Sequence, residues 1–422
     1  MAGIRKSKKH AGLLLLMLTG LGLACLVLPE TAAGGAAPVW AKRYPGADYV
    51  WYISNPLALD SQGNVYVTAW IRGAETGYDY LTIKYSPNGR KLWARRYNGP
   101  GNGDDRAAAM TMDSRGNVYV TGGSLGKTNW DWATVKYSPD GRRLWVRRYQ
   151  NGNGGAKAIA LDSQDNIYVS GEWATIKYDP DGRQLWVRPF EALRSHPAAL
   201  AVDNQENAYI LGDLSSANGT STLPIIKYDP NGQQLWMTDY QTVYDFNPGW
   251  WSSAIALDAQ GNAYVAGGEL GYFLVMKYSP EGQKLWAHGQ FLGGNYGKPR
   301  AIAVDGLGNV YVTGTAIYYE PHTGAQSRYL TIKYSPAGQI IWIRDDPGGS
   351  GALALDGEGN VYVTGYPATI KYNPEGQKIW EQTRNGGNAA IALDRQGNVY
   401  VTGTSGQDLV TTKYIQTPRN GR

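Results

Sequence analysis

A motif of roughly 50 residues recurs eight times along this chain and restricts the fold more than any other feature. In the first part of each copy an Asp is followed four residues later by Asn, and two residues after that by Tyr. The eight Asp residues are Asp60, Asp113, Asp162, Asp203, Asp258, Asp305, Asp356 and Asp394. The second part ends in a Trp-containing segment, with Trp40, Trp93, Trp145, Trp186, Trp236, Trp286, Trp342 and Trp380. A repeat of this size is one supersecondary unit that buries its core only by stacking on its neighbours.

Each copy predicts four β-strands. Residues 65–68, Val-Tyr-Val-Thr, combine β-branched and aromatic side chains and are apolar on both faces, as in a strand packed between neighbouring sheets. The Asp-x-x-Gly-Asn segment predicts a tight turn in which the Asp carboxylate accepts backbone N–H bonds and Gly takes a positive φ. Residues 86–89, Ser-Pro-Asn-Gly, predict a second tight turn before the Trp strand. Four antiparallel strands with regular Trp and Gly are typical of a propeller blade.

The ends of the repeat region predict how the ring closes. Residues 39–44 form a lone Trp strand, whereas residues 412–414 form a third strand with no fourth strand after it. Pairing the two fragments completes one blade and removes an open sheet edge. We therefore expect an all-β fold, a single eight-bladed β-propeller of four-stranded antiparallel blades over residues 39–414. A short linker is expected at 34–38 and a C-terminal tail at 415–422.

The blade sequences GNVYVTG, TGYDYLTIKYSPNG and LWARRYNGPGNGDD resemble the SBBP family of bacterial β-propeller repeats over nearly all of residues 39–414. That family is typically found on exported bacterial proteins and has no general catalytic assignment. The Gly-x-x-Leu-Trp strand is also similar to the repeat of quinoprotein-like eight-bladed propellers. Those include quinone-dependent dehydrogenases and non-catalytic scaffolds of outer-membrane assembly. The dehydrogenases use a vicinal Cys pair beside the quinone, whereas the one Cys of this chain, Cys25, lies before the repeats.

The first 33 residues predict a signal peptide. Four basic residues between positions 5 and 9 precede an uncharged, largely apolar run at 11–29, and small residues follow up to Ala33, where we expect cleavage. The run is also long enough for an uncleaved membrane anchor, and Cys25 leaves a lipoprotein as a third alternative. All three place the repeats outside the cytoplasm, as an extracellular, periplasmic or cell-surface domain.

Composition and motifs exclude several classes of function. Hydrophobic residues make up 42% and charged residues 18%, which is enough apolar material for a core. The net charge of +5 includes the basic leader, so the body is near neutral and nucleic acid is not expected as a partner.

The residues that could act in catalysis or metal binding are each explained by a structural role. The repeated Asp and Lys predict blade geometry, because catalysis needs one site rather than eight. His196, His288 and His322 fall in different blades without metal-ligand spacing, and Asp104-Asp105 favour a solvated acidic loop over a calcium site. We therefore expect no catalytic residues, no metal and no cofactor, although an enzyme is not ruled out.

The candidate binding surface follows from the strand order. Both tight turns of every blade should lie on one face of the ring, and the variable connections on the other, with long insertions at 69–80, 213–223, 241–253 and 315–329. Trp and Tyr there offer rigid contact area with a polar edge. The candidate ligand-binding residues are Trp51, Trp70, Tyr78, Asp79, Tyr80, Trp130, Asp131, Trp132, Trp250 and Trp251. Each aromatic side chain could instead cap the core, and Asp79 and Asp131 could instead cap strand entries.

The sequence thus favours a non-catalytic, monomeric propeller that binds a protein or carbohydrate ligand on the variable-loop face. The membrane is expected as a partner only through an uncleaved N-terminal segment. Two alternatives stay open. One is an enzyme, either a quinoprotein-like oxidoreductase or a hydrolase or lyase with a site near the central channel. The other is a structural scaffold of an envelope assembly.

Overall fold

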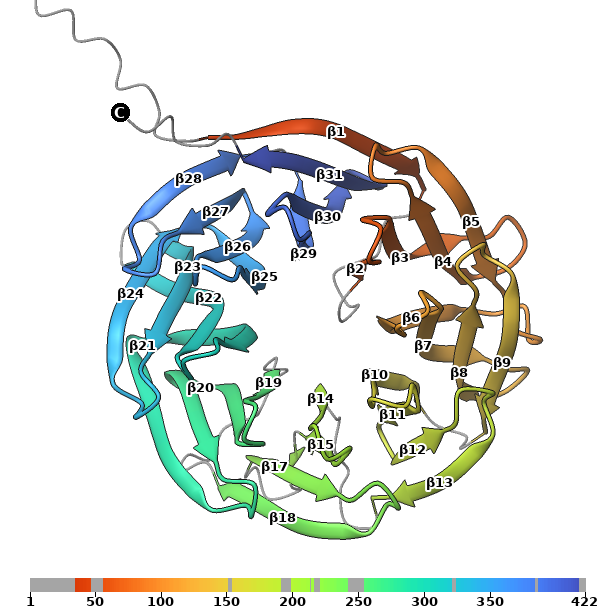
Figure 1. Cartoon of the computed structure of the whole chain (residues 1–422), viewed down its shortest axis with the longest axis horizontal. Helices are drawn as coiled ribbons and strands as arrows, with labels where there is room; N and C mark the ends of the chain where they lie inside the picture. Colours follow the sequence, from red (N-terminus) through yellow and green to blue (C-terminus); the bar gives the residue numbers. More distant parts are fainter. Residues whose placement is uncertain are drawn as a thin grey trace, which may run out of the picture.

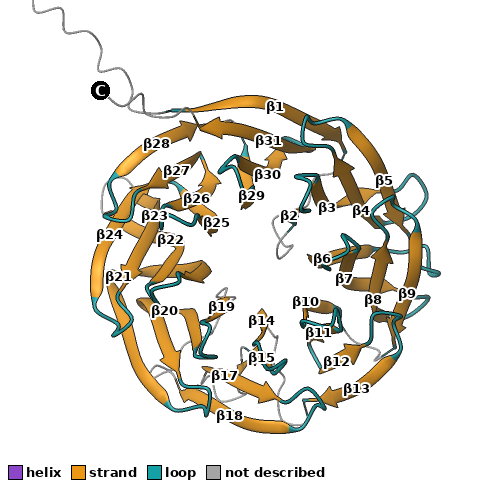
Figure 2. Ribbon diagram, in the orientation of Figure 1, coloured by secondary structure: helices purple, strands orange, loops and turns teal. Residues whose placement is uncertain are grey.

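A computed structural model describes residues 35–46, 56–150, 154–190, 199–212, 214–215, 221–241, 254–320, 324–383 and 386–416. These residues form an all-β ring of eight blades around a central axis (Figures 1 and 2). The predicted fold class is therefore confirmed. Among the described residues, no helix has the length and apolar character needed to cross a bilayer.

The strands follow the predicted four-per-blade order. The first blade contains β2 (Leu57–Leu59), β3 (Val65–Arg72), β4 (Tyr78–Tyr85) and β5 (Lys91–Tyr97). The second contains β6 (Asp105–Met112), β7 (Val118–Leu125), β8 (Trp130–Tyr137) and β9 (Arg143–Tyr149). The third contains β10 (Ala156–Leu161), β11 (Ile167–Gly171), β12 (Ala174–Tyr178) and β13 (Gln184–Pro189). The fourth contains β14 (Ala199–Val202), β15 (Ala208–Leu211), the short β16 (Leu214–Ser215), β17 (Ser221–Tyr228) and β18 (Gln234–Gln241).

The fifth and sixth blades run together in one sheet. It consists of β19 (Ala254–Leu257), β20 (Ala263–Tyr278), β21 (Lys284–Val304), β22 (Val310–Glu320), β23 (Gly324–Tyr334) and β24 (Ile340–Pro347). At 16 and 21 residues, β20 and β21 each cover the length of two ordinary strands. The seventh blade contains β25 (Gly349–Leu355), β26 (Val361–Tyr366), β27 (Ala368–Tyr372) and β28 (Lys378–Thr383). The eighth contains β29 (Gly387–Leu393), β30 (Val399–Ser405), β31 (Asp408–Gln416) and β1 (Ala36–Pro45).

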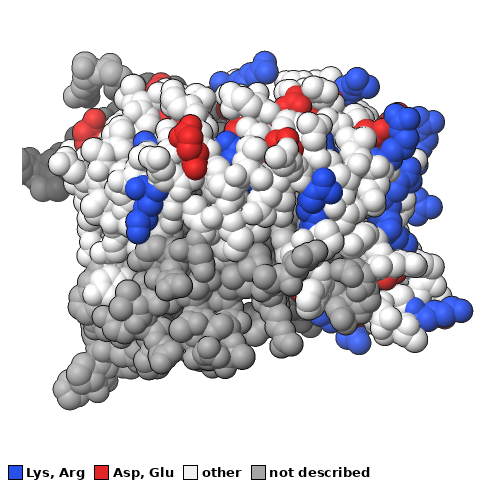
Figure 3. Space-filling view, turned by 90° about the horizontal axis from the view of Figure 1, so that it is seen from below, with Lys and Arg blue, Asp and Glu red and all other residues white. Residues whose placement is uncertain are grey.

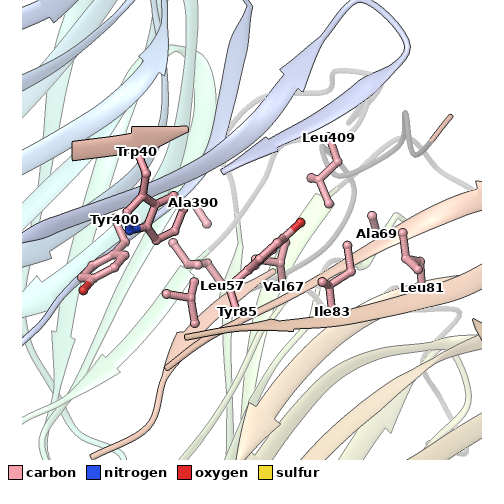
Figure 4. Close-up of a cluster of buried hydrophobic side chains, with 11 residues drawn as sticks. Trp40, Leu57, Val67, Ala69, Leu81, Ile83, Tyr85, Ala390, Tyr400 and Leu409 are labelled. Carbon is pink, nitrogen blue, oxygen red and sulfur yellow. The ribbon is translucent and has the colours of Figure 1, made fainter. Parts of the chain in front are cut away.

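The N-terminal strand closes the ring as the sequence predicts. β1 pairs antiparallel with β31, with Trp40 opposite Lys413, and the pairing extends back to Ala36 opposite Gln416. The strand therefore begins three residues earlier than the predicted propeller boundary. Trp40 packs between the eighth and first blades against Tyr400 on one side and Tyr85 on the other (Figure 4). The core consists of such clusters between successive blades.

The repeated polar residues hold the first tight turn. Asp60 Oδ1 accepts the backbone N–H groups of Gln62 and Asn64, and Asp60 Oδ2 accepts the Asn64 amide at 2.7 Å and the Tyr66 hydroxyl at 3.2 Å. Lys84 Nζ lies 3.4 Å from the same oxygen. Because equivalent bonds recur in the other blades, these residue types serve blade geometry.

Both tight turns of a blade lie on one face, as predicted. Gly63, at φ +75°, lies against Pro87 of the second turn, 3.6 Å from its Cγ when a Cβ is placed on the glycine. The variable connections lie at the opposite ends of the strands. We call these two surfaces the turn face and the loop face.

Two of the predicted insertions are not irregular loops. β3 and β4 remain paired out to Arg72 and Tyr78, and β22 and β23 remain paired out to Glu320 and Gly324. The inserted residues lengthen the two central strands of a blade because continued antiparallel pairing satisfies their backbone N–H and C=O groups.

Candidate functional site

The loop face carries a pocket of about 620 Å³ where the first three blades meet. Such a volume is typical of sites for small ligands or single side chains. Its aromatic wall comes from Trp70 near the end of β3, Tyr78 at the start of β4 and Trp130 at the start of β8. These positions lie on the edge of the loop face because the inserted residues extend the hairpins outward.

Arg106 stands between the two indole rings of this wall. Its guanidinium carbon lies 5.6 Å from the Trp70 ring centroid and 5.2 Å from the Trp130 ring centroid, within cation–π range of both. Trp70 is held in turn by its Nε1–H, which donates to the Ala107 carbonyl at 2.6 Å. The stack connects the first two blades and fixes the aromatic wall.

Asp104 holds Tyr78 and Arg106 in place at the aromatic wall of the pocket. One carboxylate oxygen accepts the Tyr78 backbone N–H at 2.9 Å, and the other accepts the Arg106 guanidinium at 2.6 Å. Asp104 approaches so closely that a Cβ on Gly77 would lie 2.0 Å from its Oδ1. Only glycine at position 77 permits this arrangement.

The opposite wall belongs to the third blade. Lys157 of β10 forms an ion pair of 3.2 Å with Glu172, which lies between β11 and β12. The floor between the walls consists of small residues and backbone, and Gly155 approaches Gly123 so closely that a Cβ on Gly155 would lie 2.7 Å from the Gly123 Cα. The cations of the pocket are both paired with carboxylates, so the site offers aromatic surface and directional polar groups with little net charge.

The structure brings three of the predicted site residues together in this pocket, namely Trp70, Tyr78 and Trp130. Tyr80 and Trp132 instead lie in the core, 1% and 2% exposed, where a ligand does not reach them. Tyr80 donates its hydroxyl to backbone carbonyls of the second blade, which explains its burial. Three further predicted residues, Trp51, Trp250 and Trp251, lie outside the described residues.

The two predicted aspartates hold their own blades together. Asp79 pairs with Arg96 at 2.8 Å, and Asp131 pairs with Arg148 at 2.6 Å. Both carboxylates are buried at the start of a central strand, which matches the alternative reading of strand-entry caps. Asp131 and Arg148 also line a second loop-face pocket of about 490 Å³.

The expectation of a solvated acidic loop at Asp104-Asp105 is wrong for Asp105. Asp105 is fully buried and accepts the Gly99 backbone N–H at 2.6 Å. Burial raises the pKa of this carboxyl to about 6, although hydrogen bonds from Ser124 and Gly99 oppose the shift. The residue begins β6, and its carboxylate holds the connection from β5 through the Gly99 N–H.

Sequence reasoning missed Arg106, Lys157 and Glu172. A usable signal existed for Arg106, because it interrupts an innermost strand that is otherwise rich in Ala, where a charge has no packing role. Lys157 carries the same signal, since it lies between two Ala residues of the innermost strand β10. Glu172 carries none, because only the approach of the third blade makes it a neighbour of the aromatic wall.

The turn face also contains hollows. One of about 1050 Å³ lies among turns of the eighth, first and second blades and is lined by residues that include Asp60, Asp113 and Asp394. Each of these carboxylates already accepts bonds from its own Asn and Tyr. Among the described residues, no three His, Cys, Asp or Glu side chains gather as a metal site would require.

Comparison with known proteins supports the fold. Residues 290–317 match a family model described as the SBBP β-propeller repeat. Sqt1 from Chaetomium thermophilum superposes with a TM-score of 0.58 at 9% identity, covering 89% of this chain and 100% of that one. The WD40 domain of Neurospora crassa Pan2 superposes with a TM-score of 0.52 at 10% identity, covering 93% and 98%. These identities establish similarity of fold alone, and no curated protein matches the chain in sequence.

Proposed function

We propose that this chain, an SBBP-type eight-bladed β-propeller, is an exported, non-catalytic interaction module that binds its ligand on the loop face. The observation that carries the proposal is the pocket formed by Trp70, Tyr78, Arg106 and Trp130, together with Lys157 and Glu172. The residues that repeat in every blade are occupied in holding turns and neighbouring blades. The combination of residues in this pocket draws on three different blades, so it offers a specific surface.

The ligand presents a ring or side chain to the pocket, from either a glycan or a protein. Indole and phenol rings stack on flat apolar surface, while the paired Arg106, Asp104, Lys157 and Glu172 orient polar groups. The basic and apolar leader of the sequence supports export. This reading does not require a cofactor or a metal.

The test is binding by Trp70→Ala and Trp130→Ala variants to a glycan array and to fractionated envelope proteins whose bound component is identified. Both variants should keep the melting temperature of a folded propeller and lose at least about tenfold in affinity for the ligand, since buried aromatic anchors dominate interface energies. The matched control is Leu307→Ala, which removes an 82% exposed apolar side chain from the turn face. Binding that survives both Trp variants and is lost with Leu307→Ala contradicts the proposal.

A further inference from the structure

The outer wall of the ring has an uneven charge that the repeat does not require. Four consecutive outermost strands, β1, β5, β9 and β13, carry nine Lys or Arg and no Asp or Glu. The outermost strands of the other four blades, β18, residues 284–290 of β21, β24 and β28, carry three Lys or Arg and four Asp or Glu. Lys and Arg gather along the right edge of Figure 3, the side on which β9 and β13 lie in Figure 1.

Some of these cations have a structural task. Two residues after the Trp, Arg95 donates its Nε–H to the Gly141 carbonyl of the next blade at 2.6 Å, and Arg147 and Arg188 make the equivalent bond. These bonds connect blades without neutralising the charge. One residue further on, Arg96 and Arg148 pair with Asp79 and Asp131.

Four basic residues at the start of these strands or directly before them donate no such bond to a neighbouring blade. Arg90 and Lys91 of the first blade, and Arg142 and Arg143 of the second, are exposed and form no ion pair within the described part of the chain. Lys91 lies 5.4 Å from the Tyr44 ring centroid, and Arg142 lies near the exposed Asp140. We call these four residues the basic rim. The equivalent positions in the fifth blade are Gln283 and Lys284, so blade geometry does not demand two cations there.

We propose that the basic rim binds an acidic polysaccharide. Uronic acid units carry carboxylates, and the planar guanidinium of arginine binds a carboxylate through two parallel hydrogen bonds. The rim lies where the convex outer wall formed by β5 and β9 (Figure 1) meets the turn face, because its residues begin these strands or directly precede them. A linear polymer can follow such a curve, whereas a flat bilayer touches the wall along one line. Predicted export favours an envelope polysaccharide over nucleic acid as the polyanion.

The experiment measures binding of the full chain to polygalacturonate at a series of salt concentrations. Lys91→Gln with Arg143→Gln should raise Kd about fivefold, because two exposed charge contacts are lost, and should weaken the salt dependence. The control of equal charge change is Lys284→Gln with Lys378→Gln, which removes the cation from the same strand position in the fifth and seventh blades, where Lys378 is paired with Asp346 and Glu381. We expect the control to change Kd less than about twofold.

The outcomes separate this proposal from its rivals and from the loop-face site. Equal loss in the control and rim variants shows a general charge effect and overturns the inference. So does tighter binding through the rim to double-stranded DNA or to phosphatidylglycerol vesicles than to the polysaccharide. Adding Arg90→Gln and Arg142→Gln to the rim variant should raise the Kd for polygalacturonate further. Trp70→Ala in the loop-face pocket should leave that Kd unchanged. Failure of one proposal therefore does not decide the other.

Discussion

Asp105 is the residue whose chemistry the structure changes most. The side chain is fully buried, and burial raises its pKa to about 6. In the folded protein this carboxyl therefore binds more protons than in the unfolded chain at pH values between about 4 and 6. The free energy of unfolding contributed by this group is greatest below that window and falls as the pH rises through it.

We expect Asp105→Asn to remove this contribution. At pH 7 the variant should be more stable than the parent by up to about 3 kcal/mol. The parent pays for ionising a buried carboxyl whose pKa lies roughly two units above its ordinary value, and the neutral Asn side chain does not. Below pH 4 the difference should vanish, since the parent carboxyl is then protonated in both states. Denaturant unfolding of both proteins between pH 3.5 and 8 measures the difference. Asp104→Asn is the neighbouring control and should not show it, and a difference that is constant with pH contradicts the assignment.

At the scale of elements, the contact between successive blades depends on one recurring bond. Seven of the eight repeated Trp side chains donate Nε1–H to the carbonyl of the turn Pro in the next blade, as Trp93 does to Pro139 at 3.0 Å. Lys84 Nζ donates to the same carbonyl at 3.1 Å. The eighth, Trp380, is equally buried, but its Nε1 has no partner within the described part of the chain.

Trp93→Phe should therefore destabilise the protein more than Trp380→Phe. Both substitutions remove similar apolar volume, and only the first breaks a hydrogen bond and leaves the Pro139 carbonyl short of a donor. We expect a difference in unfolding free energy of about 1–2 kcal/mol, measured by guanidinium titration. Equal losses would show that packing alone sets the contribution of these Trp residues.

At the scale of the whole molecule, the ring closes at a seam in the eighth blade, where β31 pairs with β1 from the other end of the propeller. Lys371 finds its acceptor in the Gln416 side chain at 2.6 Å instead of a Pro carbonyl. A pocket of about 900 Å³ lies at this point, lined by residues that include Lys371, Trp380 and Gln416. Within the described residues, the junction between the seventh and eighth blades thus lacks the Trp–Pro bond that the seven other junctions have.

A circular permutant tests this reading. Tyr414 would be joined to Pro38 through Ser-Pro-Asn-Gly-Arg, the five residues that separate Tyr85 from Lys91 in the first blade, because both pairs face each other in the same way. New ends would lie between the exposed Lys127 and Thr128. The added Pro carbonyl should accept from Trp380 and Lys371.

The control for this circular permutant is the same permutant with Gly-Ser-Gly-Ser-Gly as the linker. We expect the Pro-containing linker to be more stable by about 1–3 kcal/mol in chemical unfolding. No difference between the two linkers would show that the seam already satisfies its polar groups in another way.

The sequence by itself determined the blade. The spacing of Asp60, Asn64, Tyr66 and Lys84 specifies a set of bonds within one repeat, and eight copies with complementary ends determine a closed ring. These features were predictable because they depend on local turn chemistry and on a period that the chain repeats. The common face of the tight turns followed from antiparallel strand order alone.

Only the tertiary structure decided which residues form a site. Trp130 and Trp132 are two positions apart and alike in sequence, yet the first lines the loop-face pocket and the second is buried against the third blade. Arg106, Lys157 and Glu172 join Trp70 because three blades converge there. Sequence separation does not encode such contacts, since strand extension and the packing of neighbouring blades determine which side chains remain exposed.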